Sequence, residues 1–404
     1  MTNTGLLPAL NRRIIVPHTV QIPRSGEGSA SALKDGTILF IHNQFRGSGA
    51  DHDSACLFGG ILDPLTGEIR DGRVILEDRD AVNQINPGLE RLVNGDLGII
   101  FLRRTAKDED DLFFSRSADE GRTWSRPVQV NTCCEEKFIV VNNDRFRRLS
   151  SGRLAIPAAL YPDRGDKSRP CSLAMFYSDD DGVTWTISER IKILDKNLTP
   201  PHAMHPDAGQ AWKDGCDYYA KEQEPGVEEL ADGRLLLYCR TFVAYMYQSF
   251  SSDGGTSWTE LKAATDIVSP CSPQSIRRIP GSRRLLCVFN NRRHIAFGDA
   301  EHFWHARTPL TLAASDDDAA TWQVLGNLED ESHDHCYTSM LFFENKLLLT
   351  YYESENSIQD GKPVRRALAS LKMQILDLKP AKGLRASRSK AYPRMTPINA
   401  NRMR

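Results

Sequence analysis

The chain has 404 residues, of which 40% are hydrophobic and 26% are charged, and its formal net charge is −2 at pH 7. These values are ordinary for a soluble globular protein, and a charge near zero argues against a dedicated nucleic-acid-binding protein. The length alone favours two or three domains, although repeat folds of this size form a single domain.

The N-terminus and the cysteines bear on the compartment of the protein. The first residues lack a basic region followed by an apolar run, so no signal peptide is predicted. No apolar run approaches the ~18 residues needed to span a membrane. The nine cysteines form no Cys-x-x-Cys pair, and Cys239 and Cys287 lie within apolar, strand-like runs. We therefore predict a cytoplasmic protein without membrane contact, whose cysteines are buried in a reducing compartment.

In chain order, the first repeated pattern is an apolar residue, a short turn and a run of aliphatic or β-branched residues, which is typical of a β-hairpin. It occurs six times, at residues 33–40, 92–97, 149–154, 230–235, 279–285 and 343–347. The starts are 59, 57, 81, 49 and 64 residues apart. The longest interval contains an insertion over residues 196–221, rich in Pro, His, Asp and Gly. We expect it to lie on a loop that shapes a binding face.

The second repeated pattern reads S-x-D-x-G-x-T-W. It occurs at Ser117–Trp124, Ser178–Trp185, Ser251–Trp258 and Ser315–Trp322, with starts 61, 73 and 64 residues apart. The third copy has Ser257 in place of Thr, and the fourth has Ala319 in place of Gly. Asp followed by Gly suits a tight turn, because the carboxylate can accept backbone amides and Gly tolerates a positive φ. Ordinary hairpin turns are the alternative, but four copies with shared offsets favour a repeat fold.

These turns resemble the Asp-boxes of the sialidase superfamily, whose members fold as six-bladed β-propellers. The resemblance implies an all-β fold of six four-stranded antiparallel blades over residues 1–378. Residues 379–404 carry eight Lys or Arg and no acidic residue, and we expect a disordered basic tail there. The rest of the chain then carries about −10. The Asp-box is structural and occurs in propellers that are not sialidases, so it supports a fold and not a reaction.

Four residues resemble the sialidase site more closely. Glu224 and Arg240 bracket a hairpin in the way that a catalytic Glu and a substrate-binding Arg do in that family. Arg307, followed by Thr-Pro-Leu, resembles the next substrate-binding Arg, and Tyr337 resembles the nucleophilic Tyr. The resemblance spans roughly residues 27–355.

A fifth residue, Asp51, resembles the acid/base Asp of the family, with Arg46 five residues before it. Asp53 competes with Asp51 for this role, and either carboxylate suits a turn. His52 is a further candidate contact. The sequences Asp51-His52-Asp53 and His333-Asp334-His335 invite a metal interpretation, but neither has a metal-site signature, so no metal or other cofactor is expected.

These residue types also fit one chemistry without the family. A phenol with an ordinary pKa near 10 is a poor nucleophile at neutral pH, and a neighbouring carboxylate such as Glu224 can take its proton as it attacks. Tyr suits an anomeric carbon that already bears an anionic group, which would repel a carboxylate nucleophile. Guanidinium groups such as those of Arg240 and Arg307 bind such an anion in a bidentate manner. Tyr337 as a half-buried strand residue, and Glu224 as a counter-ion for Arg240, are the structural alternatives.

The sequence departs from the family before the first hairpin. Where sialidases carry the first of three carboxylate-binding arginines, the chain reads Gly26-Glu27-Gly28, with Glu27 as the charged residue. Ile22-Pro23-Arg24 lies slightly earlier, in reversed order. Arg46 or Arg145 is expected to compensate. This departure concerns the substrate more than the reaction class.

Two blade-entry segments add candidate sugar contacts. Asn86 precedes the second hairpin, and Asn142-Asn143-Asp144-Arg145 precedes the third; both also suit blade-start turns. Taken together, the sequence predicts a retaining exo-glycosidase that releases a terminal, acidic, sialic-acid-like sugar from a glycan. A carbohydrate-binding propeller without catalysis, or a polysaccharide lyase or other glycosidase on the same scaffold, is the alternative.

Overall fold

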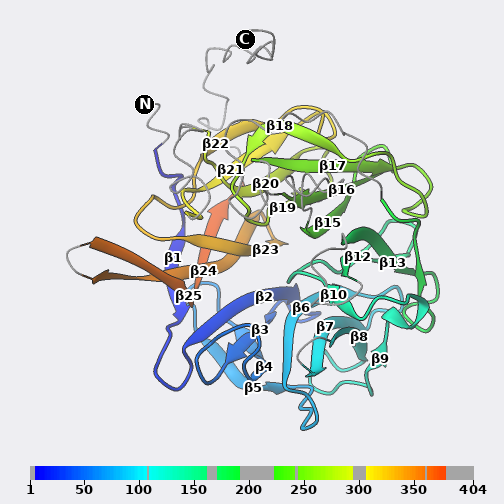
Figure 1. Cartoon of the computed structure of the whole chain (residues 1–404), viewed down its shortest axis with the longest axis horizontal. Helices are drawn as coiled ribbons and strands as arrows, with labels where there is room; N and C mark the ends of the chain where they lie inside the picture. The colour runs from blue at the N-terminus through cyan, green and yellow to red at the C-terminus, as the bar shows by residue number, and fades with distance from the viewer. Residues whose placement is uncertain are drawn as a thin grey trace, which may run out of the picture.

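The computed structural model in Figure 1 is built almost entirely of β-strands. It describes residues 5–106, 109–161, 171–191, 223–241, 244–293, 306–359 and 362–378. The predicted insertion at 196–221 and the predicted tail at 379–404 lie outside these ranges. In the described part of the chain the one helix is a short 3₁₀ turn, η1 (Asn131–Cys133). The all-β prediction is confirmed.

Three of the sheets are four-stranded and antiparallel. In sheet order, their strands are β15 (Gln223–Glu229), β16 (Leu235–Arg240), β17 (Tyr245–Ser251) and β18 (Lys262–Val268); β19 (Ser275–Arg278), β20 (Leu285–Asn290), β21 (Leu310–Ser315) and β22 (Gln323–Asn327); and β1 (Asn11–Val16), β25 (Lys362–Asp377), β24 (Lys346–Gln359) and β23 (His335–Phe343). The last sheet joins the two ends of the described chain, because β1 pairs with β25.

The remaining thirteen strands form one continuous sheet. They are β2 (Arg24–Ala32), β3 (Ile38–Phe45), β4 (Ala55–Leu62), β5 (Ile69–Ile75), β6 (Asn83–Arg91), β7 (Leu97–Ala106), β8 (Glu109–Ser117), β9 (Val128–Gln129), β10 (Phe138–Val140), β11 (Arg147–Arg148), β12 (Leu154–Tyr161), β13 (Ser172–Ser178) and β14 (Thr186–Ile187). Two of its junctions, β4 with β6 and β8 with β10, are parallel and rest on one residue pair each. All its other pairings are antiparallel.

The six predicted hairpins all form. They join β2 to β3, β6 to β7, β11 to β12, β15 to β16, β19 to β20 and β23 to β24. Their turns are closed by short backbone bonds, such as the 2.8 Å bond from Leu33 N to Thr37 O and its equivalent from Leu230 N to Arg234 O. The inner strands of these hairpins contact one another in a closed sequence. First strands make all of these contacts (β2 with β6, β6 with β11, β15 with β19, β19 with β23 and β23 with β2), except that the third hairpin reaches β15 through its second strand, β12. They surround the centre of the molecule in Figure 1.

The core lies between the strands of successive hairpins, both within the thirteen-stranded sheet and between separate sheets. One buried cluster combines residues of β3 with residues of β7, and another combines residues of β16 with residues of β20. The strands are therefore buried on both faces where they meet the next sheet, which explains the continuous aliphatic runs in their sequences. No helix in the described residues is long and apolar enough to cross a lipid bilayer.

The four S-x-D-x-G-x-T-W segments adopt one geometry. In the second copy, Ser178 Oγ donates to Asp180 Oδ1 at 2.7 Å, and the amide of Gly182 donates to Ser178 Oγ at 2.8 Å. The amide and hydroxyl of Thr184 donate to the two oxygens of Asp180, at 2.9 and 2.6 Å. The other three copies repeat these bonds. Each turn follows the strand after a hairpin and leads into the next one: β8 to β9, β13 to β14, β17 to β18 and β21 to β22.

Candidate functional site

Some of the predicted site residues sit at irregularities in the central strands. The pairing register shifts between Gly26 and Ser29, between Ile85 and Gly88, between Gln223 and Gly226, and between Cys336 and Ser339. In each bulge one residue other than glycine has a positive φ: Glu27 (51°), Asn86 (60°), Glu224 (49°) and Tyr337 (58°). A bulge re-aims a side chain relative to the regular alternation of a strand. Four of the ten predicted residues therefore occupy equivalent positions on four strands.

Tyr337 and Glu224 are brought together across the centre. The phenol Oη of Tyr337 donates to Glu224 Oε1 at 3.3 Å, although the residues are 113 positions apart. The same Oε1 lies 2.8 Å from Arg240 Nη2, and both side chains of this ion pair are about one-tenth exposed. Arg240 ends β16, directly opposite Gln223 at the start of β15, and it also donates to the Gln223 amide oxygen at 2.8 Å.

Arg307 completes this group from the segment before β21. Its guanidinium carbon lies 5.3 Å from the centre of the Tyr337 ring, and its Nη1 contacts Cys336 Sγ at 3.1 Å. Its backbone amide donates to Asp334 Oδ1 at 2.9 Å, which fixes this segment to the start of β23. Among the described carboxylates, none lies within 4.0 Å of the Arg307 guanidinium, so Arg307 suits an external anion.

Burial dominates the electrostatics of the phenol. It raises the pKa of Tyr337 above its ordinary value, and the adjacent Glu224 carboxylate raises it further, whereas Arg240 and Arg307 oppose the rise. The phenol is therefore neutral near pH 7, and its proton points to the carboxylate that can accept it. Both guanidinium groups would stabilise a developing phenolate.

Asp51 enters the site from the loop between β3 and β4. Its side chain is 66% exposed, and its Oδ1 accepts a 2.5 Å bond from Arg24 Nη1. Asp53 has a different position. Its carboxylate accepts the amide of Ser48 at 2.6 Å and that of Ala50 at 3.3 Å, so it folds the loop on which Asp51 stands. Of the two alternatives from the sequence, Asp51 is the one that pairs with Arg24, which donates to Tyr352; the Tyr352 ring lies edge-on to that of Tyr337, with centroids 6.0 Å apart.

Glu27 lies beside Asp51 and is almost fully buried. Its Oε1 accepts Arg24 Nη2 at 3.1 Å, and its Oε2 accepts the amide of Asn43. Burial raises the pKa of Glu27 to about 7, against the opposing effect of Arg24. Asn43 also exchanges bonds with Asn86, accepting its backbone amide at 2.8 Å. Glu27 and Asn86 are thus joined through Asn43.

Within the described residues, no hydrogen bond or ion pair joins the other three predicted contacts, Arg46, His52 and Arg145, to these residues. Arg46 is exposed and stands near the Cys56 thiol, and His52 is exposed on the Asp51 loop. Arg145 is 1% exposed, and its guanidinium donates to Gln274 O at 2.6 Å and to Tyr238 Oη at 3.4 Å. The guanidinium beside Asp51 is that of Arg24.

The rings of His333 and His335 lie with their centroids 6.2 Å apart. His335 is buried, and its Nε2 lies 3.2 Å from Glu353. Within the described residues, no group of three or more His, Cys, Asp or Glu side chains is arranged to hold a metal ion.

Sequence reasoning missed Arg24, Asn43 and Tyr352. Arg24 Nε donates to Tyr352 Oη at 2.8 Å, across 328 positions of sequence. The signal for Arg24 was its place beside Pro23, two residues before the family-like position. Nothing local distinguishes Asn43 or Tyr352 from other residues of apolar strands.

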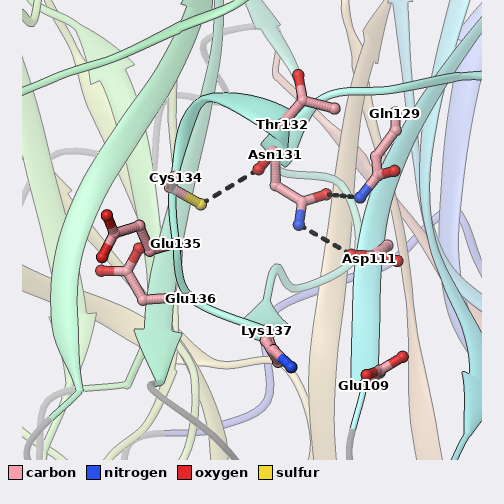
Figure 2. Close-up of a pocket in the computed structure, with 9 residues that line it drawn as sticks. All are labelled: Glu109, Asp111, Gln129, Asn131, Thr132, Cys134, Glu135, Glu136 and Lys137. Atoms are coloured by element: carbon pink, nitrogen blue, oxygen red, sulfur yellow. Dashed lines mark hydrogen bonds between the residues drawn. The ribbon is translucent and has the colours of Figure 1, made fainter.

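A pocket of about 290 Å³ lies elsewhere, at the edge formed by β8, β9 and η1 (Figure 2). Several of the polar side chains that line it bond to a neighbouring side chain of the protein. Asn131 Nδ2 donates to Asp111 Oδ1 at 2.9 Å, and Glu136 pairs with Arg190 at 2.8 Å. The pocket shares no residue with the group around Tyr337.

Comparison with known proteins shows the family to which the chain belongs. Residues 69–396 match the family of BNR repeat-like domains. The chain belongs to this family. Its fold is similar to that of a protein of unknown function from Dyadobacter fermentans (TM-score 0.66, 16% identity, 92% of this chain and 98% of that one). It is also similar to the Hadza microbial sialidase Hz136 (0.67, 16%, 91% and 68%) and to the intramolecular trans-sialidase of Ruminococcus gnavus in complex with oseltamivir carboxylate (0.64, 14%, 92% and 98%). At these identities the likeness shows a sialidase-like fold.

Proposed function

We propose that this protein is a retaining exo-glycosidase that releases a terminal, acidic, sialic-acid-like sugar from glycans. The observation that carries the proposal is the Tyr337–Glu224 contact at 3.3 Å, with the Arg240 and Arg307 guanidinium groups beside it. A carbohydrate-binding surface has no need of a half-buried phenol hydrogen-bonded to a carboxylate between two guanidinium groups. That arrangement is what an activated tyrosine nucleophile requires.

The proposed reaction has two steps. In the first, the Tyr337 oxygen forms a bond to the anomeric carbon while Glu224 takes the phenol proton. The bond from that carbon to the leaving oxygen breaks, and Asp51 supplies the proton to that oxygen. In the second, Asp51 takes a proton from water, and the water oxygen forms a bond to the anomeric carbon. The bond from that carbon to the Tyr337 oxygen breaks, and the phenol recovers its proton from Glu224. Arg240 and Arg307 hold the anionic group of the sugar throughout.

We also propose that the sheets are six blades of a β-propeller. If the thirteen-stranded sheet is divided at its two single-pair parallel junctions, it yields three sets, each with one hairpin and further antiparallel strands. With the three separate four-stranded sheets, these make six sets. The closed sequence of contacts among the central strands supports the same arrangement.

A release assay tests the reaction. The protein is incubated with aryl α- and β-glycosides of sialic acids, uronic acids and neutral sugars, and the product anomer is followed by NMR. We expect release from an acidic glycoside, with retention of configuration in the first product. Inversion would contradict the Tyr337 mechanism. Saturable binding without release would favour the carbohydrate-binding alternative, and an unsaturated product would favour a lyase.

A further inference from the structure

Arg24 connects the exposed Asp51 carboxylate to the interior. Its side chain is 12% exposed, whereas that of Asp51 is 66% exposed. All three guanidinium nitrogens are engaged: Nε with Tyr352 Oη at 2.8 Å, Nη1 with Asp51 Oδ1 at 2.5 Å, and Nη2 with Glu27 Oε1 at 3.1 Å. Because each of its nitrogens already has a partner in the protein, Arg24 is poorly suited to bind a substrate anion.

The guanidinium of Arg24 is fixed on several sides. It lies 4.4 Å from the centre of the Phe45 ring and 5.1 Å from that of Tyr352. The Tyr352 ring can occupy its position because residue 26 is glycine: a Cβ there would stand 2.2 Å from the ring. Glu27 is itself held by Asn43. The planar fork therefore has one orientation, which a flexible ammonium group would not keep.

The loop that carries Asp51 is anchored separately through its backbone. Asp51 O accepts Arg104 Nη1 at 2.8 Å and Asn83 Nδ2 at 3.0 Å. Arg24 Nη1 also approaches Gly49 O at 3.4 Å. The backbone bonds hold the loop in place, while the Arg24 bond sets the direction of the Asp51 carboxylate.

We infer that Arg24 is a positioning residue that aims Asp51 at the leaving oxygen, and that Glu27 is the counter-carboxylate that fixes Arg24. This inference rests on the proposed function, because it assigns Arg24 to the proton transfer by Asp51. A misplacement of about 1 Å in a catalytic group is enough to cost about 10²-fold in rate. The loss should appear where proton donation limits the rate, namely with poor leaving groups.

The test compares leaving groups. Arg24→Met, Arg24→Lys, Glu27→Gln and Asp51→Asn are assayed on the aryl glycoside hydrolysed in the release assay and on its methyl counterpart. We expect Arg24→Met to lower kcat/KM about 10²-fold on the methyl glycoside and only a few-fold on the aryl glycoside. Methylguanidinium added to Arg24→Ala should restore part of the lost activity on the methyl glycoside. Arg24→Lys should resemble Arg24→Met, and Glu27→Gln should show a smaller loss of the same kind.

Arg234→Met, which removes an arginine paired with Asp232 on a surface hairpin, is the control and should affect neither substrate. Equal losses on both glycosides, or no loss on either, in both Arg24→Met and Glu27→Gln would overturn the positioning role. If Asp51→Asn retains its leaving-group dependence in that experiment, the acid/base assignment survives and only the role of Arg24 falls. If Asp51→Asn shows no such dependence, both fall.

Discussion

The residues of the candidate site share an unfavourable backbone conformation. Glu27, Asn86, Glu224 and Tyr337 each have a positive φ, which costs of order 1–3 kcal/mol for a residue other than glycine. Such conformations persist only where the surrounding structure enforces them. Here the flanking strand pairing resumes on both sides of each bulge. The protein thus uses the same local distortion to direct two carboxylates, an amide and a phenol.

The roles of Tyr337 and Glu224 predict a shared loss of turnover. Tyr337→Phe removes the nucleophilic oxygen, and Glu224→Gln removes the group that accepts its proton. Each should lower kcat at least about 10²-fold on aryl and methyl glycosides alike, because the bond from Tyr337 to the anomeric carbon must form whichever group leaves. Steady-state assays check this. Near-wild-type turnover by Tyr337→Phe would exclude the covalent mechanism.

The buried Glu27 carboxyl predicts a pH effect on stability. Burial raises its pKa from 4.5 to about 7, so the folded protein holds a proton that the unfolded chain releases. The contribution of this group is fully present below pH 4.5 and is lost as the pH rises through 7. Glu27→Gln cannot lose that proton. Between about pH 5 and pH 8 the Tm of Glu27→Gln should therefore rise relative to that of the wild type.

Thermal unfolding at several pH values measures this difference. Glu68→Gln, which changes an exposed carboxylate, is the matched control and should follow the wild type. A Tm difference between Glu27→Gln and the wild type that stays constant across this pH range would show that Glu27 titrates normally.

At the scale of elements, the second motif turn also packs its own strands against those of the preceding hairpin. Gly182 has a φ of 85°, and a Cβ there would stand 2.4 Å from the Phe114 ring of the preceding strands. Trp185 of the same turn contacts that ring edge-on, with centroids 5.5 Å apart. The glycine is therefore required by conformation and by space.

Substitutions at two glycines distinguish the cost of backbone conformation from the cost of a steric clash. Gly281 has a φ of 72°, and no atom lies within 4 Å of the place where a Cβ would stand, so Gly281→Ala should cost only the left-handed strain, about 1–2 kcal/mol. Gly182→Ala adds the clash with Phe114 and should cost about 1–3 kcal/mol more. Urea unfolding of both variants checks the order. Equal costs would mean that the Phe114 ring moves aside freely.

These elements also show what the sequence could reveal. The hairpins and motif turns were predicted because their signals lie within about eight or nine residues. Tyr337, Glu224, Arg240 and Arg307 were predicted to meet through a family resemblance. The Arg24–Tyr352 bond was not predicted, because it arises only when the first hairpin and the last sheet come together. The residues next to Arg24 and Tyr352 in the sequence do not indicate such a contact.

At the scale of the whole molecule, one buried carboxylate ties several sheets together. Asp144 accepts Ser29 Oγ from β2 at 3.1 Å, Arg277 Nη2 from β19 at 2.6 Å and the amide of Met340 from β23 at 3.0 Å. Its own segment leads into β11. The Asp144 carboxylate thus connects four hairpins, and it fixes their spacing around the centre.

Because Asp144 bonds to several strands, we expect its substitution to cause a large loss of stability. Asp144→Asn leaves the buried Arg277 guanidinium without its closest carboxylate, which typically costs about 3–5 kcal/mol. Asp179→Asn, which breaks the surface pair with Arg153, is the comparison and should cost no more than about 1 kcal/mol. The free energy of unfolding in urea measures both. Similar values for the two variants would show that Asp144 is not a structural tie.

The pairing of β1 with β25 has a consequence for how the protein is made. Asn11 pairs with Ile375, so β1 leaves the ribosome long before the strand with which it pairs. At about 5–20 residues per second, that delay is roughly 20–70 s. During that time β1 is an unpaired strand on a nascent chain, exposed to chaperones and to other copies. Moving β1 to follow β25, by circular permutation, would let the final sheet assemble from a continuous stretch of chain.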